Sequence, residues 1–329
     1  VNKGNRLSKI GLCVNPMSGR DVRRLAARAT NMTHEAKRDI VARIAAGADS
    51  VGVTDIFVMR EPFRIASLAL EHIKLRARVH ILDAPIKNDS RDTEEGLRCF
   101  LEAGCKTIVS LGGDGTNRAI VKSSSDIDLI PLSTGTNNVF PISVEPTLAG
   151  IVAGLNALGR LTEVELKSRS KVIHIKHNTI SDIALIDLVK VVNDQLGSLL
   201  PFKPRNIEKL LLTRAEPASI GMSPIGGFID PVYQQDDAGL IVNLSDEGRT
   251  VRVPLSPGLF GDLEVSSVER VCLNQSVEFH GPGILAMDGD RLIELADGES
   301  ALATVRRDGP FVIDVDRAMR WAASNGIIS

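Results

Sequence analysis

The sequence predicts two domains, an α/β domain followed by a β-rich, sandwich-like domain. In the first half, short runs of β-branched apolar residues alternate with segments of helical periodicity, a pattern typical of a parallel sheet flanked by helices. After about residue 168, short strand-like runs follow one another between Gly, Pro and Asp, a pattern typical of a β-sandwich. A chain of 329 residues is long enough for two hydrophobic cores. We expect domains at 1–167 and 168–312, and a C-terminal helix within 313–329 that returns to the first domain.

The elements of the first domain can be placed from their apolar periodicity. Asp92 precedes the fourth expected helix and Glu95 follows three residues later, which indicates an N-cap at Asp92. Because ligands of such sheets bind beyond the carboxyl ends of the strands, the loops after the strands are the expected binding sites. Strands are expected at 9–14, 55–59, 78–82, 107–111 and 128–132, and helices at 22–29, 35–46, 65–75, 93–103 and 117–123.

The second domain is expected to be built mostly from short strands. One helix is predicted at 204–213, and the tail at 315–323 is helical and carries the only tryptophan, Trp321. Strands are expected at 171–177, 181–192, 239–244, 250–255, 263–265, 276–279, 284–287 and 300–306.

Composition excludes several classes of function. A formal net charge of −2 gives no support to nucleic acid or an anionic membrane as the main partner. No apolar run approaches the roughly 20 residues that a membrane helix needs. The four cysteines show no CxxC pair, and the first expected strand leaves no room for a signal peptide. We therefore expect a reduced, cytoplasmic protein.

The strand at 107–111 runs into the segment Gly-Gly-Asp-Gly-Thr at 112–116, and a helix is expected directly after it. Glycines let the backbone approach a ligand closely, and the start of a helix presents N–H groups and a partial positive charge to an anion. Each charge-assisted hydrogen bond of this kind contributes roughly 1.5–3 kcal/mol. The segment therefore predicts a phosphate-binding loop.

Asp114 is the unexpected member of this loop, because a carboxylate repels the anion that the loop suits. Its presence makes sense if it binds a metal ion that bridges phosphates, or if it accepts a proton from an attacking hydroxyl. A positioned base typically contributes about 10²–10⁴-fold to a rate. The structural alternative is an Asp that caps the helix after a glycine-rich turn.

Three further loops carry polar residues and glycines in a similar setting. They are Asn-Pro-Met-Ser-Gly at 15–19, the segment 131–140 with Ser-Thr-Gly-Thr-Asn-Asn at its centre, and Met-Asp-Gly-Asp at 287–290. Each has an ordinary alternative: a strand exit fixed by proline, a polar turn, and an Asp-Gly hairpin turn.

Taken together, these loops resemble those of the superfamily of ATP-NAD kinases and diacylglycerol kinases. Gly-Gly-Asp-Gly-Thr resembles the signature of that superfamily, and the other three loops match its elements in order over nearly the whole chain. Within the superfamily the chain most resembles the NAD-kinase-like branch called acetoin catabolism protein X, through residues 15–24, 112–118 and 133–141.

The resemblance implies a NAD-kinase-like and phosphofructokinase-like α/β domain, an active site between the two domains, and a homo-oligomer, either a dimer or a tetramer. It implies ATP as phosphoryl donor with a divalent cation, Mg²⁺, and the 2′-hydroxyl of NAD as acceptor. Asp114 would be the catalytic acid beside the acceptor hydroxyl, Asp187, Gly226 and Gly227 would line the acceptor pocket, and Asp288 and Asp290 would bind the metal. Phosphate and nucleotide contacts are expected from Asn15, Ser18, Gly19, Gly112, Gly113, Gly115, Thr116, Asn117, Gly135, Thr136, Asn137 and Asn138.

The expected acceptor pocket departs from the family pattern. NAD kinases carry an Asn beside an acid on a strand after the first domain, and here Ile186 precedes Asp187. The glycine pair at 226–227 is kept, but the hydroxyl-rich and tyrosine-containing loop before it is lost, and Tyr233 is the only tyrosine of the chain. The acceptor pocket has therefore diverged more than the phosphate loops.

Three functions remain as hypotheses. The first is a kinase that transfers a phosphoryl group to a hydroxyl. The second is a non-catalytic nucleotide-binding accessory protein of acetoin catabolism, which the eroded acceptor pocket favours. The third is a kinase for a lipid or a small diol, although a content of 3% aromatic residues indicates no obvious apolar groove.

Overall fold

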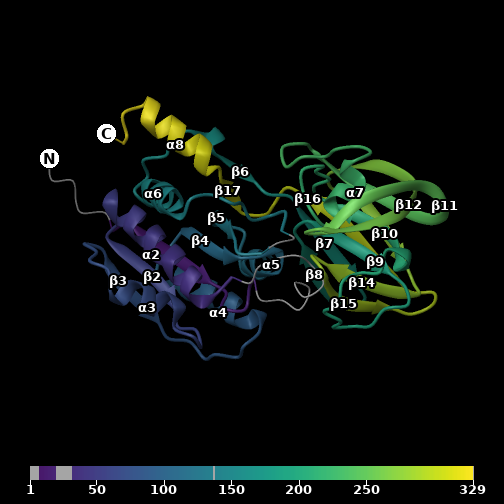
Figure 1. Cartoon of the computed structure of the whole chain (residues 1–329), viewed down its shortest axis with the longest axis horizontal. Helices are drawn as coiled ribbons and strands as arrows, with labels where there is room; N and C mark the ends of the chain where they lie inside the picture. The colour runs from purple at the N-terminus through teal and green to yellow at the C-terminus, as the bar shows by residue number, and fades with distance from the viewer. Residues whose placement is uncertain (1–6, 20–31, 136–137, 329) are drawn as a thin grey trace.

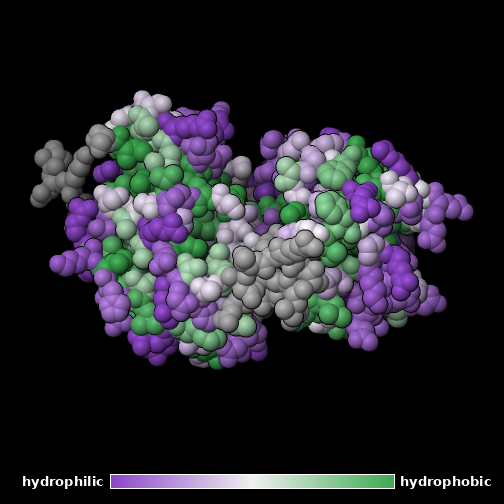
Figure 2. Space-filling model, in the orientation of Figure 1, coloured by the Kyte–Doolittle hydropathy of each residue, from purple (hydrophilic) through white to green (hydrophobic). Residues whose placement is uncertain are grey.

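The computed structural model describes residues 7–19, 32–135 and 138–328. Figure 1 shows two lobes side by side, with an α/β lobe on the left and a β-rich lobe on the right. Figure 2 shows a notch between the lobes at the upper edge of the view and hydrophilic residues over most of their outer margins. Among the described residues, none of the helices is both long and apolar enough to cross a bilayer.

A seven-stranded sheet forms the centre of the first lobe, in the order β3-β2-β1-β4-β5-β17-β6. The first six strands in that order run parallel, and only β6 is antiparallel to its neighbour. All five predicted strands are confirmed, whereas the short β6 and β17 were not expected. The strands are β1 (Lys9–Val14), β2 (Asp55–Met59), β3 (Arg78–Leu82), β4 (Thr107–Gly112), β5 (Asp128–Ser133), β6 (Lys167–Arg169) and β17 (Phe311–Ile313).

Helices cover both faces of this sheet. One face packs against α2 (His34–Ser50), α3 (Ile65–Glu71), α6 (Pro146–Ala157) and α8 (Val315–Ser324), and the other packs against α4 (Ser90–Glu102) and α5 (Asp114–Ser123). The C-terminal helix therefore returns to the first lobe, as predicted. The expected helix at 22–29 lies outside the described residues.

The predicted N-cap of α4 at Asp92 is wrong. The cap is Asp89, whose side chain accepts a hydrogen bond from the Arg91 amide at 2.9 Å. Asp92 lies in the first turn, and its carboxylate accepts from the amides of Lys87 and Asn88, both at 2.7 Å. Asp92 thus fixes the backbone of the two residues that precede the N-cap.

Helix α6 was missed because its sequence is apolar on nearly every side and rich in small residues. Its packing explains that composition, since a Cβ atom on Gly150 would lie 2.0 Å from the carbonyl oxygen of Ile44 in α2. In the same way, a Cβ atom on Gly47 of α2 would lie 2.2 Å from the Thr147 carbonyl oxygen. The two helices therefore meet backbone to backbone, and only glycine fits where they touch.

The second lobe is a sandwich of two antiparallel sheets, as predicted. A six-stranded sheet in the order β12-β11-β10-β9-β14-β15 packs on a four-stranded sheet in the order β13-β16-β7-β8, with a shared apolar core between them. The short helix α7 (Ser223–Gly227) packs on the outer face of the larger sheet. The strands are β7 (Val172–His177), β8 (Ile180–Ala184), β9 (Asp187–Val191), β10 (Ile207–Leu212), β11 (Ala238–Ser256), β12 (Leu259–Cys272), β13 (Ser276–His280), β14 (Gly283–Met287), β15 (Asp290–Leu295) and β16 (Ser300–Arg306).

Two predictions for this lobe are wrong. The expected helix at 204–213 is a single 3₁₀ turn at Pro204–Asn206 followed by strand β10, which pairs with β9 and β11. Leucines 210, 211 and 212 are all fully buried because both faces of β10 are covered, so their pattern lacks the alternation that marks a strand. The expected strand at 181–192 is two strands, β8 and β9, that belong to different sheets and separate at Leu185 and Ile186.

The expected strands at 239–244 and 250–255 form one long strand, β11, whose register with β12 shifts between Leu244 and Arg249. The expected strand at 263–265 is the middle of the 14-residue β12, and β15 was not expected. The strands predicted at 171–177, 276–279, 284–287 and 300–306 are confirmed.

The chain passes between the lobes twice, and the two passages lie together. The Ser170 amide donates to the Pro310 carbonyl at 2.9 Å, and the Gly309 amide donates to the Ser170 carbonyl at 3.1 Å. A Cβ atom on Gly309 would lie 2.2 Å from the Ser170 hydroxyl, so the two passages are in close contact. Figure 1 shows α5 of the first lobe facing β8 of the second.

Candidate active site between the two lobes

Three glycine-containing loops meet at the carboxyl edge of the parallel sheet. They follow β1, β4 and β5, which are consecutive neighbours in the sheet. Asn15 Nδ2 donates to Thr116 Oγ1 at 2.8 Å, which joins the first loop to the second. Thr134 Oγ1 donates to Ser18 Oγ at 2.8 Å, which joins the third loop to the first. The fold thus brings together the loops that the sequence singled out.

Hydrogen bonds between the side chains of Asn15 and Ser18 and the loop's own backbone stabilise the Asn15–Gly19 loop. Asn15 Oδ1 accepts from the amides of Met17 and Ser18 at 2.9 and 3.2 Å, and Ser18 Oγ donates back to the Asn15 carbonyl at 2.8 Å. Gly19 ends the turn at a φ of +72°, which side-chain-bearing residues rarely adopt.

A buried lysine of α2 holds this loop from below. Lys37 is fully buried, and its Nζ donates to the carbonyl oxygens of Asn15, Pro16 and Ser18 at 2.7–2.8 Å. The ammonium group therefore fixes three backbone carbonyls of the loop and places a positive charge next to it. Sequence reasoning missed this residue, because a lysine in a helix is usually solvent-exposed.

The second and third loops interlock through Asn138. A Cβ atom on Gly113 would lie 2.8 Å from Asn138 Oδ1, and one on Gly135 would lie 2.0 Å from Asn138 Nδ2. Both positions must therefore be glycine for the amide to lie between them. Gly112 is restricted in the same way by Thr116, at 2.4 Å. Thr136 and Asn137 lie outside the described residues.

Gly115 lies on the side of the loop that faces the second lobe, whereas Asn117 lies inside the first lobe. Gly115 faces the second lobe, where the nearest atom to an added Cβ would be Asp290 Oδ2 at 3.6 Å. Asn117 is fully buried; its Oδ1 accepts from the Ser110 hydroxyl at 2.7 Å and its Nδ2 donates to the Gly113 carbonyl at 2.8 Å. Asn117 therefore shapes the loop from within.

Asp114 is the first residue of α5 and is 8% exposed. Its Oδ1 accepts from the Phe140 amide at 2.9 Å, and both carboxylate oxygens lie 3.2–3.3 Å from the Val139 amide. Burial, together with the nearby charge of Asp288, raises the pKa of Asp114 to about 7, although the two amides and Arg214 act against that rise. The carboxyl group is thus held in place and tuned to change its charge near neutral pH.

The acidic turn of the second lobe faces α5. Asp288 has a positive φ of 49°, and its carboxylate accepts from the amides of Leu185, Ile186 and Asp187 at 2.8–3.3 Å. These amides belong to the chain segment where β8 ends and β9 begins. Burial raises the pKa of Asp288, while Arg118 and the three amides oppose the rise.

Arg118 of α5 crosses from the first lobe to this turn. Its Nη2 lies 2.7 Å from Asp290 Oδ2, and its Nε lies 3.8 Å from Asp288 Oδ2. One helical turn further, Lys122 pairs with Asp182 of β8 at 3.0 Å. The helix that begins at Asp114 is therefore tied to the second lobe along one face. Within the described parts of the chain, no group of three or more His, Cys, Asp or Glu side chains is arranged to hold a metal ion.

The residues predicted for the acceptor pocket lie in two places. Asp187 is buried at the start of β9, and its amide donates to Asp288, so it adjoins the acidic turn. Gly226 and Gly227 pack inside the second lobe instead, where added Cβ atoms would lie 2.5 Å from Leu240 Cδ2 and 2.7 Å from the Glu216 carbonyl carbon. Close packing of α7 accounts for this glycine pair.

Sequence reasoning also missed Arg214, which follows β10. Its Nη1 donates to the Val139 carbonyl at 3.3 Å, its Nε donates to Gln234 Oε1 at 3.0 Å, and its guanidinium lies 5.5 Å from the centre of the Phe140 ring. Arg214 and Asp114 therefore contact the same two residues, Val139 and Phe140. Because the segment 204–213 was predicted as a helix, Arg214 did not appear as a residue at the carboxyl end of a strand.

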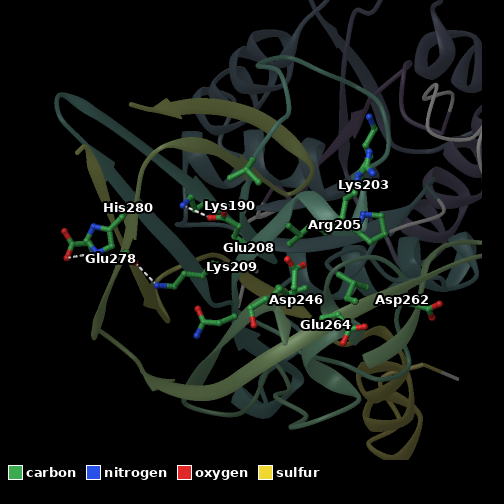
Figure 3. A pocket seen from close by; sticks show the side chains of 17 residues that line it. Lys190, Lys203, Arg205, Glu208, Lys209, Asp246, Asp262, Glu264, Glu278 and His280 are labelled. Carbon is green, nitrogen blue, oxygen red and sulfur yellow. Dashed lines mark hydrogen bonds and ion pairs between the residues drawn. The ribbon is translucent and has the colours of Figure 1, made fainter. Parts of the chain in front are cut away.

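A separate groove of about 960 Å³ lies on the second lobe and shares no lining residue with the glycine-containing loops. Figure 3 shows charged side chains of both signs around it. Lys190 pairs with Glu208 at 2.6 Å, and Lys209 Nζ donates to the Glu278 carbonyl at 2.7 Å. Both of these lysines therefore already have protein partners.

Comparisons with known proteins agree with this arrangement. Residues 10–161 match the family of the ATP-NAD kinase N-terminal domain, and residues 171–308 match that of the acetoin catabolism protein X C-terminal domain. Acetoin catabolism protein X of Cupriavidus necator is 30% identical over 335 residues, which cover 97% of this chain and 93% of that protein. The chain belongs to the acetoin catabolism protein X family.

Two solved structures are similar to this chain. Yeast NADH kinase complexed with NADH matches with a TM-score of 0.53 and 14% identity, covering 97% of this chain and 87% of that one. A diacylglycerol kinase of Bacillus anthracis matches with a TM-score of 0.46 and 14% identity, covering 94% and 98%. The match to NADH kinase shows the fold, a parallel sheet with helices followed by a β-rich region.

Proposed function

We propose that this protein is an ATP-dependent kinase that transfers the γ-phosphoryl group of ATP to a hydroxyl. The observation that carries the proposal is the position of Asp114. A buried acid stands at the start of α5, at the point where three glycine-containing loops are tied together by side-chain hydrogen bonds. Phosphoryl transfer depends mainly on holding phosphates in place and on positioning the nucleophile, and this site has parts for both tasks.

The phosphates would lie against the first turn of α5. N–H groups in the first turn of a helix have no partner within the helix and point toward an incoming anion. Gly115 carries no side chain, and the nearest atom to an added Cβ, Asp290 Oδ2, lies 3.6 Å away, so no atom presses on the backbone there. Thr116 Oγ1 accepts from Asn15 and keeps its own proton free to donate to a phosphate oxygen.

Asp114 would act as the general base. The acceptor oxygen forms a bond to the γ-phosphorus, the bond from that phosphorus to the β,γ-bridging oxygen breaks, and the proton of the hydroxyl passes to Asp114. A pKa of about 7 suits this role, because a base works best when its pKa lies near the working pH. The amides of Val139 and Phe140 fix the direction of the carboxylate.

We propose the 2′-hydroxyl of NAD as acceptor. The match of residues 10–161 to the ATP-NAD kinase N-terminal domain supports this choice. Ile186, which stands where NAD kinases carry an Asn, is fully buried, and its amide is bonded to Asp288. Contacts to the adenosine of NAD would therefore have to come from Asp187 and other neighbours.

A divalent cation would reach the site with the nucleotide. Asp290 is paired with Arg118, and the Asp288 carboxylate already accepts three amide hydrogen bonds. These two acids as arranged do not fit a resident metal ion. Mg²⁺ commonly binds through substrate phosphates while keeping several waters, and it would neutralise phosphate charge here.

A second candidate function is a nucleotide-binding accessory protein without transferase activity. The feature that favours it is the Asp114 carboxylate, whose two oxygens accept from amides of the 139–140 segment and leave few lone pairs for a substrate. A regulatory protein would need the phosphate-binding loops to bind a nucleotide, but it would not need Asp114 to accept a proton. A lipid or a small diol is the remaining alternative for the acceptor.

The deciding experiment is an assay of ATP consumption with Mg²⁺ against NAD, NADH and small diols, for the native chain and for D114N. We expect product with one acceptor and a loss of about 10²–10⁴-fold in D114N. ATP affinity, measured by calorimetry, should change little in D114N. ATP binding without product from any acceptor would favour the accessory role, and equal turnover in D114N would remove Asp114 from the mechanism.

A further inference from the structure

The described part of the chain contains a buried arginine that has no carboxylate partner. Arg214 is 9% exposed, and its described side-chain hydrogen bonds go to Gln234 and to the Val139 carbonyl, not to a carboxylate. Its nearest acids, Glu216 and Asp114, act on it only through space, and burial lowers its pKa. A buried charge without a partner destabilises a fold, so its retention needs a reason.

Two hydrogen bonds fix the orientation of Arg214. Nε is held by Gln234, whose own amide donates to the Arg169 carbonyl at 2.9 Å, and Nη1 is held by Val139. Ser223 Oγ also donates to the Arg214 carbonyl at 2.9 Å. The guanidinium is therefore set in one direction, with no described protein acceptor for Nη2.

Other cations near Arg214 increase the positive charge that an anion would neutralise. Lys171 is buried behind it, donates to the carbonyls of Tyr233, Asp236 and Ala238, and has its pKa lowered to about 7 by burial and by the charges of Arg307 and Arg214. Lys171 and Arg307 thus add to the positive charge around Arg214.

We infer that Arg214 binds an oxyanion of the ligand that lies against Asp114. This inference rests on the proposed function and deepens it. Two oxyanions could reach that place: the γ-phosphoryl group of ATP, or a phosphate carried by the acceptor. A guanidinium suits both, because its planar set of N–H donors matches phosphate oxygens. Arg214 would then be a substrate-binding residue contributed by the second lobe to the phosphate loops of the first.

The test measures binding and not turnover. Calorimetric affinities for ATP, ADP and NAD are compared between the native chain and the variants R214Q and R214K. If Arg214 binds the γ-phosphoryl group, R214Q weakens ATP binding about 10- to 100-fold and leaves ADP binding unchanged. If Arg214 binds the acceptor, R214Q weakens NAD binding by a similar factor and leaves both nucleotides unchanged. R214K should fall between, because it keeps the charge and loses the planar donor geometry.

A matched control separates ligand binding from structural support. Arg291 is also a buried arginine over a phenylalanine, with its guanidinium 4.2 Å from the Phe202 ring, but it is paired with Asp194 at 2.8 Å. We expect R291Q to lower the melting temperature and to keep all three affinities. R214Q should keep or raise the melting temperature, because it removes an uncompensated charge.

The inference is overturned if R214Q binds ATP, ADP and NAD with native affinity. A loss of stability like that of R291Q, together with native affinities, would assign Arg214 a structural role instead. A chain that turns over no acceptor, and yet shows the ATP-selective loss in R214Q, would contradict the kinase proposal alone. The two failures are therefore distinguishable.

Discussion

Asp114 combines burial with fixed hydrogen bonds, and the pH dependence of the protein should report on it. Its pKa of about 7 lies well above the usual value of an aspartate because burial and Asp288 disfavour the charged form. We expect the rate of phosphoryl transfer at saturating ATP to rise with pH through about 7 and then to level off. A pH–rate profile checks this, and a flat profile between pH 5.5 and 8.5 would exclude Asp114 as the base.

The same raised pKa has a consequence for stability. In the folded chain Asp114 keeps its proton up to about pH 7, whereas in the unfolded chain it loses the proton near its ordinary value of 3.8. The folded state therefore binds the proton more tightly, and the stabilising contribution present below pH 3.8 is lost as pH rises to about 7.

The variant D114N should escape this loss, because Asn cannot ionise. We expect the melting temperature of D114N, relative to the native chain, to increase between pH 5 and pH 8, even though the kinase proposal predicts that the variant loses activity. Thermal unfolding at the two pH values is the measurement. A difference that stays constant with pH would mean that the Asp114 pKa is not raised in the folded state.

At the scale of single elements, the loop after β1 depends on α2. Replacing Lys37 with Met would remove three hydrogen bonds to the loop and leave the carbonyls of Pro16 and Ser18 without their donor, while the Asn15 carbonyl keeps the Ser18 hydroxyl. Since each buried group left unbonded costs about 1–3 kcal/mol, K37M should destabilise the fold by on the order of 3 kcal/mol. It should also weaken ATP binding, because Asn15 and Ser18 link the three loops.

The matched control for K37M is K9M. Lys9 lies at the opposite end of β1 and donates to one carbonyl, that of Ala103, at 2.7 Å. We expect K9M to cost at most about 1 kcal/mol and to keep native ATP affinity. Denaturant unfolding and calorimetry measure the two quantities. Native ATP affinity in a folded K37M would show that α2 does not hold the loop for binding.

The elements differ in how much of them local sequence could predict. The five predicted parallel strands are short apolar runs, and three of them, β1, β4 and β5, end in glycine-containing loops, so both the strands and these loops were predicted. The segment 207–212 was not, because leucines buried on both faces of a sheet carry no alternation. Helix α6 was missed because its small residues serve contact with α2, a partner 100 residues away.

The candidate site was predictable where its residues are neighbours in sequence and not where it is assembled across the fold. Asp114 and the glycines stand in one segment. Asp288, by contrast, caps amides about 100 residues earlier in the chain, and Arg214 meets Val139 across 75 residues. Single-sequence patterns do not record such distances, so the two arginines that face the site, Arg118 and Arg214, came only from the structure.

At the scale of the whole molecule, α5 joins the lobes through ion pairs of unequal burial. The side chains of Arg118 and Asp290 are 12% and 34% exposed, and those of Lys122 and Asp182 are 45% and 14% exposed. In double-mutant cycles we expect a coupling of about 1–2 kcal/mol for Arg118 with Asp290 and less than about 1 kcal/mol for Lys122 with Asp182. Denaturant unfolding of the single and double alanine variants measures both couplings, and equal values would contradict the difference in burial.

Residues 171–308 leave the first lobe and return to it at one place, where Ser170 and Gly309 are hydrogen-bonded and β6 lies beside β17. A segment whose two ends nearly touch can be inserted, removed or exchanged during evolution without parting the strands that carry it. All three glycine-containing loops belong to the first lobe, whereas Arg214 and Asp288 belong to the segment 171–308. Replacement of residues 171–308 alone could therefore change the substrate that the protein accepts while the three loops stay as they are.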